Sequence, residues 1–272
     1  MDTIQSTLST DPDMPGSFLF DSIVFGPVYS RRLGSSLGIN LLPANKKVCT
    51  FNCIYCECGF THATTEKSKL PSTTDVITTI ENSLILNKKE GKTIDHITFA
   101  GNGEPTIHPN FLEIIEKIIV LKQKYFPDSK IAALTNGTQL HKPDVVKALS
   151  LVDNPIIKLD SAIEETVHIM DSPLVDYNLK NVIEAMIKMN SNFILQTMFI
   201  RAECKGVIVD NTTDFEVNAW LDVLKRIKPR LVQIYTISRI PASISVEKIN
   251  AETLEAIALK VNKLGIKTLV TP

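Results

Sequence analysis

The chain has 272 residues, of which 44% are hydrophobic and 22% charged, and its formal net charge is −1. These values are typical of a globular protein with one large domain or two small ones, and they argue against a large basic surface for nucleic acid. No apolar stretch is long enough to span a bilayer and no signal-peptide core is evident, so we expect a cytoplasmic protein without membrane contact.

Residues 1–16 are rich in Ser, Thr, Asp and Pro, which predicts a flexible N-terminal arm. The rest, 17–272, is expected to be a single domain with its core at about 35–240. An extended entry segment ends at Gly26-Pro27, and Arg31-Arg32 follows. Adjacent arginines before a glycine indicate either a solvated turn or an anion-binding group near a site.

Apolar runs that read as strands alternate with amphipathic helices along the rest of the chain. The predicted strands are 37–42, 95–101, 130–135, 155–160, 192–201, 230–238 and a short one at 266–270. The predicted helices are 74–89, around 111–121, 143–149, 174–189, one opened by a capping box at Thr213–Glu216, and a C-terminal helix within 250–265. This alternation predicts an α/β fold with a parallel sheet. Six core units favour a (β/α)6 partial TIM barrel with short N- and C-terminal extensions, and a doubly wound flat sheet is the alternative.

Polar residues follow the ends of the predicted strands. They are the loop after the first strand, Gly103 and Glu104, Asn136, Lys158 and Asp160, Gln196 and Arg201, and Gln233 and Tyr235. Ligands of parallel α/β folds bind at the carboxyl ends of strands, so these clusters predict one site. Plain turns at Gly103 and Asn136, and a self-satisfied ion pair between Lys158 and Asp160, are the structural alternatives.

The strongest signal is the spacing CxxxCxxC formed by Cys49, Cys53 and Cys56. Four of the five cysteines fall between Cys49 and Cys58, which does not resemble a disulfide framework and points to metal or redox chemistry. One short loop can wrap three thiolates around a metal centre, and three ligands leave one iron of a four-iron cluster open. A structural zinc site that adds Cys58 is the alternative, although its spacing would strain a tetrahedron. The roles of Cys58 and Cys204 stay open.

These motifs resemble the radical S-adenosylmethionine (SAM) superfamily. The cysteine spacing, with Tyr55 before the third cysteine, is similar to its cluster motif. Gly101-Asn-Gly103-Glu104-Pro105 resembles its GGE motif, although Asn102 separates the glycines. Segments 26–34, 103–109 and 158–161 resemble a subgroup of Fe–S oxidoreductases related to the wyosine-tRNA synthases.

The resemblance implies a [4Fe–4S] cluster on Cys49, Cys53 and Cys56 with SAM on the open iron. Reductive cleavage of SAM would give methionine and a 5′-deoxyadenosyl radical that abstracts a substrate hydrogen. The matched positions imply the following roles: Gly103 and Glu104 meet the SAM ammonium, Lys158 its carboxylate, Asn136 and Asp160 the ribose, the backbone around Tyr55 the adenine, and Arg201 a carboxylate or the substrate.

The chain departs from the wyosine-forming enzymes because no cysteine precedes Cys49 to hold a second cluster. We therefore predict a related radical enzyme whose substrate the sequence does not identify, with an RNA or a protein among the candidates and an electron donor such as flavodoxin or ferredoxin as partner. An alternative hypothesis for the substrate is tRNA, with the protein a tRNA-modifying enzyme related to wyosine synthesis. A zinc- or Fe–S-stabilised interaction protein without catalytic activity is the main competing hypothesis. A dinucleotide-binding dehydrogenase is disfavoured because Thr106 replaces the third glycine of its fingerprint.

Overall fold

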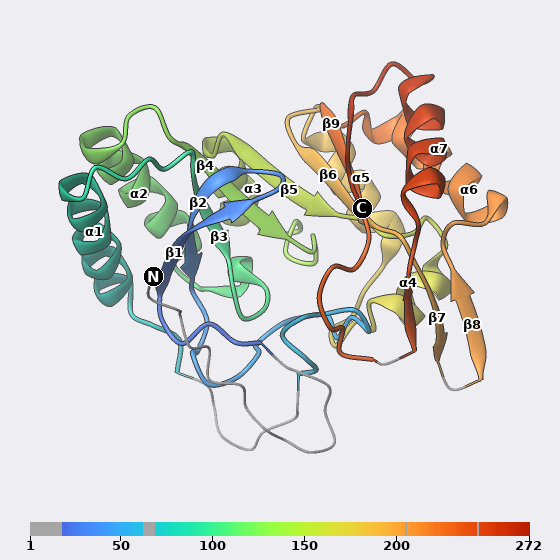
Figure 1. Ribbon diagram of the computed structural model, residues 1–272, viewed down its shortest axis with the longest axis horizontal. Helices are drawn as coiled ribbons and strands as arrows, with labels where there is room; N and C mark the ends of the chain where they lie inside the picture. The colour runs from blue at the N-terminus through green and yellow to red at the C-terminus, as the bar shows by residue number, and fades with distance from the viewer. Residues whose placement is uncertain (1–17, 62–68, 205, 244) are drawn as a thin grey trace.

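The computed structural model describes residues 18–61, 69–204, 206–243 and 245–272 (Figure 1). The arm predicted at 1–16 lies outside these residues. Among the helices described, none has the length and apolar character needed to cross a membrane.

The helices are α1 (Thr73–Lys89), α2 (Phe111–Tyr125), α3 (Pro143–Leu151), α4 (Glu164–Met170), α5 (Leu179–Lys188), α6 (Asp214–Ile227) and α7 (Ala251–Asn262), with a 3-10 turn at Pro105–Ile107. The strands are β1 (Val24–Ser30), β2 (Gly34–Asn40), β3 (His96–Ala100), β4 (Lys130–Thr135), β5 (Asn154–Lys158), β6 (Ile194–Met198), β7 (Ile200–Cys204), β8 (Val207–Asp210), β9 (Leu231–Tyr235), β10 (Val246–Lys248) and β11 (Thr268–Thr271).

Eight strands form the main sheet in the order β1-β2-β3-β4-β5-β6-β9-β11, and all neighbours are parallel except the β1–β2 hairpin. The sheet curls into a half-barrel whose helices pack on the outer face (Figure 1). The prediction of a parallel partial TIM barrel is therefore confirmed, and the six predicted core strands correspond to β2, β3, β4, β5, β6 and β9.

The core lies between the convex face of the sheet and the helices. Alternate strand residues such as Ile97 and Phe99 face the helices, because successive side chains of a strand point to opposite faces. Trp220 of α6 packs edge-on against Phe199, with ring centroids 5.4 Å apart. On the inner face, Ala132, Ile156 and Ile194 form a separate, small apolar cluster.

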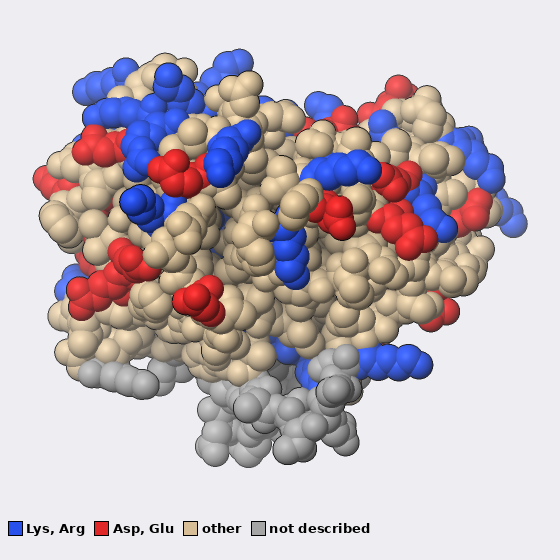
Figure 2. Space-filling model, turned by 180° about the vertical axis from the view of Figure 1, so that it is seen from behind, with Lys and Arg blue, Asp and Glu red and all other residues tan. Residues whose placement is uncertain are grey.

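Charged side chains of both signs are mixed on the face that Figure 2 shows, and Lys and Arg gather along its upper edge. Exposed basic residues pair with nearby acids, as in Arg226 with Glu184 at 2.7 Å and Lys225 with Asp222 at 2.6 Å. Such exposed pairs contribute little to stability. The near-neutral net charge corresponds to a surface on which charges of both signs are mixed.

The prediction of one strand over 192–201 is wrong, because β6 ends at Met198 and β7 begins a second sheet with the order β10-β7-β8. The Asn211 side chain stabilises this break: its amide donates to the Met198 carbonyl at 2.8 Å and its oxygen accepts from the Ile200 N–H at 2.9 Å. The Asn211 side chain thus replaces backbone hydrogen bonds that are missing between β6 and β7. No local sequence pattern predicts this contact.

The prediction of a helix over 174–189 is too long, since α5 begins at Leu179 behind the capping side chain of Asn178. The preceding segment instead pairs with the cysteine loop, where Leu174 N–H donates to the Thr50 carbonyl at 2.8 Å. The short helix α4 between β5 and this segment was not predicted.

The entry strand β1 also differs from expectation, because it continues past Gly26-Pro27 to Ser30. A register shift between Phe25 and Val28 places this dipeptide in a bulge. An edge strand tolerates a proline at a bulge, since no ladder donor is required there.

The capping box at Thr213–Glu216 forms only in part. The Thr213 hydroxyl accepts from the Glu216 N–H at 3.4 Å, as a helix N-cap does. The Glu216 carboxylate is buried and accepts from the hydroxyls of Ser161 at 2.6 Å and Thr166 at 2.5 Å. Glu216 therefore joins α6 to the connection between β5 and α4.

We expect Glu216→Ala to lower the free energy of unfolding by about 1–3 kcal/mol, because it leaves two buried hydroxyls without their acceptor. Denaturant unfolding followed by circular dichroism measures the change. Glu255→Ala, at an exposed position of α7, is the control and should shift stability by less than about 0.5 kcal/mol. Equal losses in the two variants would contradict this role of Glu216.

Candidate cofactor site around the cysteine loop

The cysteine loop follows β2 and is fixed by backbone hydrogen bonds on two sides. On one side, Val48 N–H donates to the Asn102 carbonyl at 2.8 Å, and Glu104 N–H donates to the Val48 carbonyl at 3.2 Å. On the other side, Asn52 N–H donates to the Asp171 carbonyl at 2.8 Å. The loop is therefore attached both to the end of β3 and to the end of α4.

Gly103 allows this close approach. Its φ is +138°, and a Cβ at this position would overlap the Val48 carbonyl oxygen. Asn102, which separates the two glycines of the motif, is fully buried and has a structural role of its own. Its side chain bonds both backbone groups of Phe20 at 2.8 Å and the Pro43 carbonyl at 2.9 Å. The inserted residue thus anchors the entry segment and the start of the cysteine loop.

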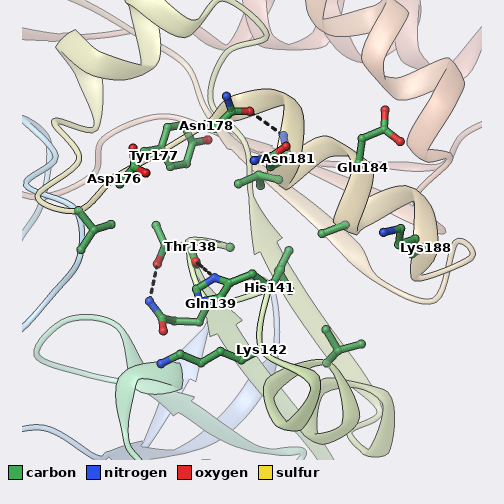
Figure 3. A pocket seen from close by; sticks show the side chains of 16 residues that line it. Thr138, Gln139, His141, Lys142, Asp176, Tyr177, Asn178, Asn181, Glu184 and Lys188 are labelled. Atoms are coloured by element: carbon green, nitrogen blue, oxygen red, sulfur yellow. Dashed lines mark hydrogen bonds between the residues drawn. The ribbon is translucent and has the colours of Figure 1, made fainter.

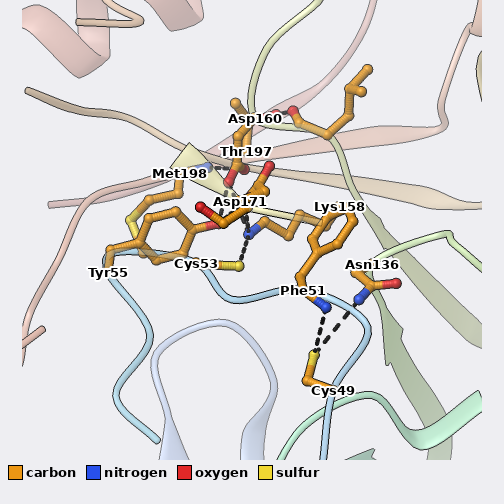
Figure 4. A network of polar contacts seen from close by, with 12 residues as sticks. Cys49, Phe51, Cys53, Tyr55, Asn136, Lys158, Asp160, Asp171, Thr197 and Met198 are labelled. Carbon is orange, nitrogen blue, oxygen red and sulfur yellow. Dashed lines mark hydrogen bonds and ion pairs between the residues drawn. The ribbon is translucent and has the colours of Figure 1, made fainter. Parts of the chain in front are cut away.

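The predicted cluster ligands lie beside different strand ends. Cys49 Sγ accepts from the Asn136 amide at 3.7 Å and from the Phe51 N–H at 3.4 Å, next to the end of β4. Cys53 Sγ is 3.3 Å from Lys158 Nζ, at the end of β5 (Figure 4). Cys53 is buried, and Cys49 and Cys56 are half-buried. Thiolates are the form that binds metal, and nearby donors and cations stabilise them.

Lys47 is a buried cation beside the cysteines that the sequence reading missed. Only 6% of it is exposed, and Nζ donates to the Gly59 carbonyl at 2.9 Å. Burial by itself lowers the pKa of Lys47. The nearby cysteines, and Cys56 most strongly, raise it by more than burial lowers it, so the pKa of Lys47 lies above its ordinary value. A hydrogen bond from Cys58, with Lys47 adding to it, lowers the pKa of Cys56 to about 6. Burial raises the pKa of Cys49 to about 11.

Lys158 lies at the centre of a buried network with Asp160, Asp171 and Tyr55 (Figure 4). Lys158 Nζ is 2.7 Å from Asp171 Oδ1 and 2.9 Å from Asp160 Oδ2. The Tyr55 hydroxyl contacts both carboxylates, at 2.9 Å from Asp171, and the Lys158 ammonium lies 4.2 Å from the centre of the Tyr55 ring. An ammonium has three donors, and Cys53, Asp160 and Asp171 account for three partners.

Burial and the Lys158 ammonium act in opposite directions on the ionisation of Asp160. Burial, with the Asp171 carboxylate adding to it, raises the pKa of Asp160 to about 8, although Lys158 opposes the rise. The alternative interpretation of Lys158 and Asp160 as an ion pair is confirmed. A further carboxylate at Lys158 would have to replace one of the present partners.

Glu104 and Asn136 meet at the ends of β3 and β4. Glu104 is 2% exposed, and its carboxylate accepts from Thr106 N–H at 3.1 Å and from Asn136 N–H at 2.7 Å. Burial raises the pKa of Glu104 despite these bonds, and within the described residues it has no ion-pair partner. A cationic group placed beside Glu104 would therefore be stabilised. The Asn136 amide donates to Thr50 at 2.8 Å, which ties this corner to the cysteine loop.

Arg201 is not brought together with the other predicted residues. It is exposed on β7, in the second sheet. Its neighbours Ile200 and Ala202 are buried in the cluster that contains Cys53 and Tyr55, so Arg201 faces the opposite way. The switch between sheets at Phe199 accounts for this placement.

The structure adds Asp171, Lys47 and Thr50 to the site. Asp171 follows α4 and reaches Lys158 from outside the strand-end positions that guided prediction. Within the described residues, no group of three or more His, Cys, Asp or Glu side chains is gathered tightly enough for a single metal ion. Cys49 instead lies beside the end of β4 and Cys53 beside the end of β5.

A cavity of about 910 Å³ adjoins the loop between the β4–α3 connection and the start of α5 (Figure 3). Tyr177 on its wall packs edge-on against Phe51, with ring centroids 5.3 Å apart. Thr138, on the facing wall, shares a hydrogen bond of 2.7 Å with Thr50. The cysteine loop is thus in contact with two walls of this cavity.

Comparison with known families matches residues 47–209 to the Radical SAM superfamily, and the chain belongs to that superfamily. Among curated relatives, a UPF0026 protein of Helicobacter pylori strain J99 is 32% identical over 232 residues, covering 85% of this chain and 71% of that protein. The UPF0026 protein MJ1312 of Methanocaldococcus jannaschii is 30% identical, with 89% and 72% covered. A protein named GTPase Obg from Brachyspira hyodysenteriae is 31% identical over 85% of this chain, which spans only 32% of that longer protein.

Solved structures agree on the fold. A radical SAM methyltransferase from Sphaerobacter thermophilus gives a TM-score of 0.64 at 14% identity, covering 87% of this chain and 65% of that one. Streptococcus suis SuiB bound to S-adenosylmethionine gives 0.60 at 13% identity, covering 84% and 49%. The relation to wyosine-tRNA synthases stays a prediction.

We expect Gly103→Ala to abolish assembly of an iron–sulfur centre while leaving the sheet folded, because the new methyl group displaces the backbone of the cysteine loop. Iron and sulfide content after anaerobic reconstitution measures assembly, and circular dichroism measures the fold. Gly91→Ala is the matched control: its φ is also positive, at +67°, but nothing lies within 4 Å of the added methyl. Full iron content in Gly103→Ala would show that the close approach is dispensable.

Proposed function

We propose that this protein is an enzyme that binds a [4Fe–4S] cluster through Cys49, Cys53 and Cys56 and uses it to cleave SAM reductively. When bound, the cluster supplies the electron that converts SAM into methionine and a 5′-deoxyadenosyl radical, which removes a hydrogen atom from a substrate. The chain itself supplies binding, orientation and exclusion of water.

The observation that carries the proposal is the pairing of the loop cysteines with buried cations. Lys47 lies against Cys56 and Lys158 against Cys53, both largely inaccessible to water. Buried charges are stable only when they are compensated. Lys158 has Asp160 and Asp171 as partners, but Lys47 has no carboxylate partner among the described residues, so its ammonium beside the loop thiols favours a resident anionic centre. A thiolate-bound cluster provides such a centre, whereas a set of neutral thiols does not.

The surrounding residues suit the polar groups of SAM. The buried Glu104 carboxylate, with Gly103 beside it, would receive the ammonium of the methionine part. Asn136 would contact the ribose from the end of β4, and the backbone around Tyr55 would border the adenine. Asp160 and Lys158 would act mainly by holding the cysteine loop, since Tyr55 and Cys53 are among their present partners.

The partners and the substrate belong to the proposal as well. Reduction of the cluster requires an external one-electron donor, for which a flavodoxin or a ferredoxin is suited. Methylation and peptide chemistry, which the names of the structural neighbours indicate for those proteins, share the radical SAM fold but do not fix the substrate of this one. The substrate is not identified, and an RNA or a protein is among the candidates.

The full-length protein, reconstituted anaerobically with iron and sulfide, should release 5′-deoxyadenosine from SAM when dithionite is added. Cys53→Ala should abolish release, because two thiolates do not hold the cluster, and Cys204→Ala on β7 should retain it. Liquid chromatography with mass spectrometry measures the product. One zinc per chain without sulfide, or product release by Cys53→Ala, would contradict the proposal and favour a metal-stabilised interaction protein.

Lys47→Met should lower the reduction potential of the cluster by roughly tens of millivolts, because a buried positive charge favours the reduced state. A redox titration followed by electron paramagnetic resonance measures the potential. Lys89→Met, at an exposed position of α1, should leave it unchanged. Normal iron content with an unchanged potential in Lys47→Met would exclude an electrostatic role for this lysine.

A further inference from the structure

The inner face of the half-barrel carries a second cavity, of about 230 Å³, which the proposed cofactor contacts leave unused. Its walls come from the β1–β2 hairpin and from inward-facing residues of β3, β4, β5, β6 and β9. Its polar lining residues are Ser30, Arg32, Ser36, Thr98, Gln196, Gln233 and Arg239, of which Arg239 is already paired with Glu57 at 2.6 Å. The volume has room for roughly seven or eight water molecules at about 30 Å³ each, which is the size of a small organic group.

Arg32 enters this cavity from the turn of the β1–β2 hairpin. Its guanidinium lies over the Tyr235 ring, 4.5 Å from the centroid. Its Nη1 atom is buried and has no hydrogen-bond partner in the part of the chain that the structure describes. The adjacent Arg31 is exposed and donates to the Pro272 carbonyl at 2.6 Å. The two arginines singled out in the sequence therefore have different roles, and only Arg32 presents an unsatisfied donor to the lumen.

An unpaired donor on a charged group is unfavourable when it is buried, by more than the roughly 1–3 kcal/mol of a neutral group. The Tyr235 ring compensates the charge in part, but it does not accept the in-plane N–H bonds. A guanidinium offers a planar pair of donors that matches a carboxylate or a phosphate. An anionic group of a ligand would supply the partner that the Nη1 atom of Arg32 lacks among the described residues.

Apart from Arg239, which is paired with Glu57, the rest of the lining consists of uncharged polar residues and apolar residues. The Gln196 amide donates to the Gln233 carbonyl oxygen at 2.9 Å, and the hydroxyls of Ser36 and Thr98 share a bond of 2.7 Å. Leu134 and Ile156 are among the apolar residues that complete the wall. Such a lining accommodates a small body with few polar atoms attached to the anionic group.

The cavity borders the candidate cofactor site through Tyr235. Lys158 pairs with Gln196 across β5 and β6, and Met198 pairs with Tyr235 across β6 and β9. The network around Lys158 therefore neighbours the two glutamines in the sheet. Tyr235 also packs against the cluster of side chains that contains Cys53 and Tyr55. A group bound at Arg32 is therefore placed next to the chemistry that the cysteine loop would support.

We propose that the substrate carries a carboxylate or a phosphate group that the Arg32 guanidinium binds inside the half-barrel, with the Gln196–Gln233 pair against its uncharged part. This inference rests on the proposed function, because the bound molecule is a substrate only if the protein is an enzyme. The anion site itself is defined by Arg32, Tyr235 and the cavity, and it exists whether or not SAM is cleaved.

The test is isothermal titration calorimetry at low ionic strength with the full-length reconstituted protein and three probes: inorganic phosphate, propionate and the neutral propionamide. We expect one of the two anions to bind and propionamide not to bind, and the preferred anion distinguishes a phosphate from a carboxylate. Arg32→Gln should weaken that binding at least tenfold. Arg32→Lys, which keeps the charge but not the planar donors, should weaken it less.

Arg31→Gln is the matched control, since it changes the neighbouring arginine of the same turn and should alter binding less than twofold. Thermal unfolding and iron content verify that each variant is folded and loaded. Failure of both anions to bind, equal losses in Arg31→Gln and Arg32→Gln, or equal binding of propionamide would overturn the anion site. Anion binding without release of 5′-deoxyadenosine would instead contradict the proposed function alone, because the calorimetry does not depend on cleavage.

Discussion

The contact on which the site depends is the approach of the Val48 backbone to Gly103. It joins the cysteine loop to the end of β3 through two backbone hydrogen bonds, and only a residue without a side chain fits at that point. Once the loop is fixed there, Cys49 lies next to Asn136 and Cys53 next to Lys158. The positions of the cysteines relative to three strands thus follow from one close backbone contact, which explains why the glycine-rich motif and the cysteine motif occur together in this chain.

Buried charge is the second constraint, and it is resolved locally. Lys158 is surrounded by two carboxylates and a thiol, and burial raises the pKa of Asp160 although the Lys158 ammonium opposes the rise. Glu104 and Lys47 are different, because each is buried without a carboxylate–ammonium partner among the described residues. Glu104 therefore lacks a cation and Lys47 has only the loop cysteines as anionic neighbours, so each is stabilised when a group of opposite charge is bound beside it.

Local sequence patterns predicted the half-barrel and the cysteine loop because both are encoded by nearby residues. Strand periodicity identified all six core strands, and the ligand spacing spans only eight residues. The errors arose where distant side chains decide the structure. Asn211 ends β6 early and carries Arg201 away from the site, and Asp171 reaches Lys158 from beyond α4. Asn211 follows β8, a strand that the sequence did not predict, and Asp171 follows α4, a helix that was also not predicted, so only the folded chain reveals both residues. The roles toward SAM stay predictions.

The turn of the β1–β2 hairpin contacts the opposite side of the open half-barrel. A sheet that stops short of closure leaves two edges, here β1 and β11, with the inner face accessible between them. The hairpin turn crosses toward the far edge, where Arg31 reaches Pro272 beyond β11 and Arg32 reaches Tyr235 on β9. The exposed contact of Arg31 is weak, so it does not seal the opening by itself. Because the Nη1 donor of Arg32 has no partner among the described residues, an anion that binds there would lie between the hairpin turn and the Gln196–Gln233 pair of β6 and β9.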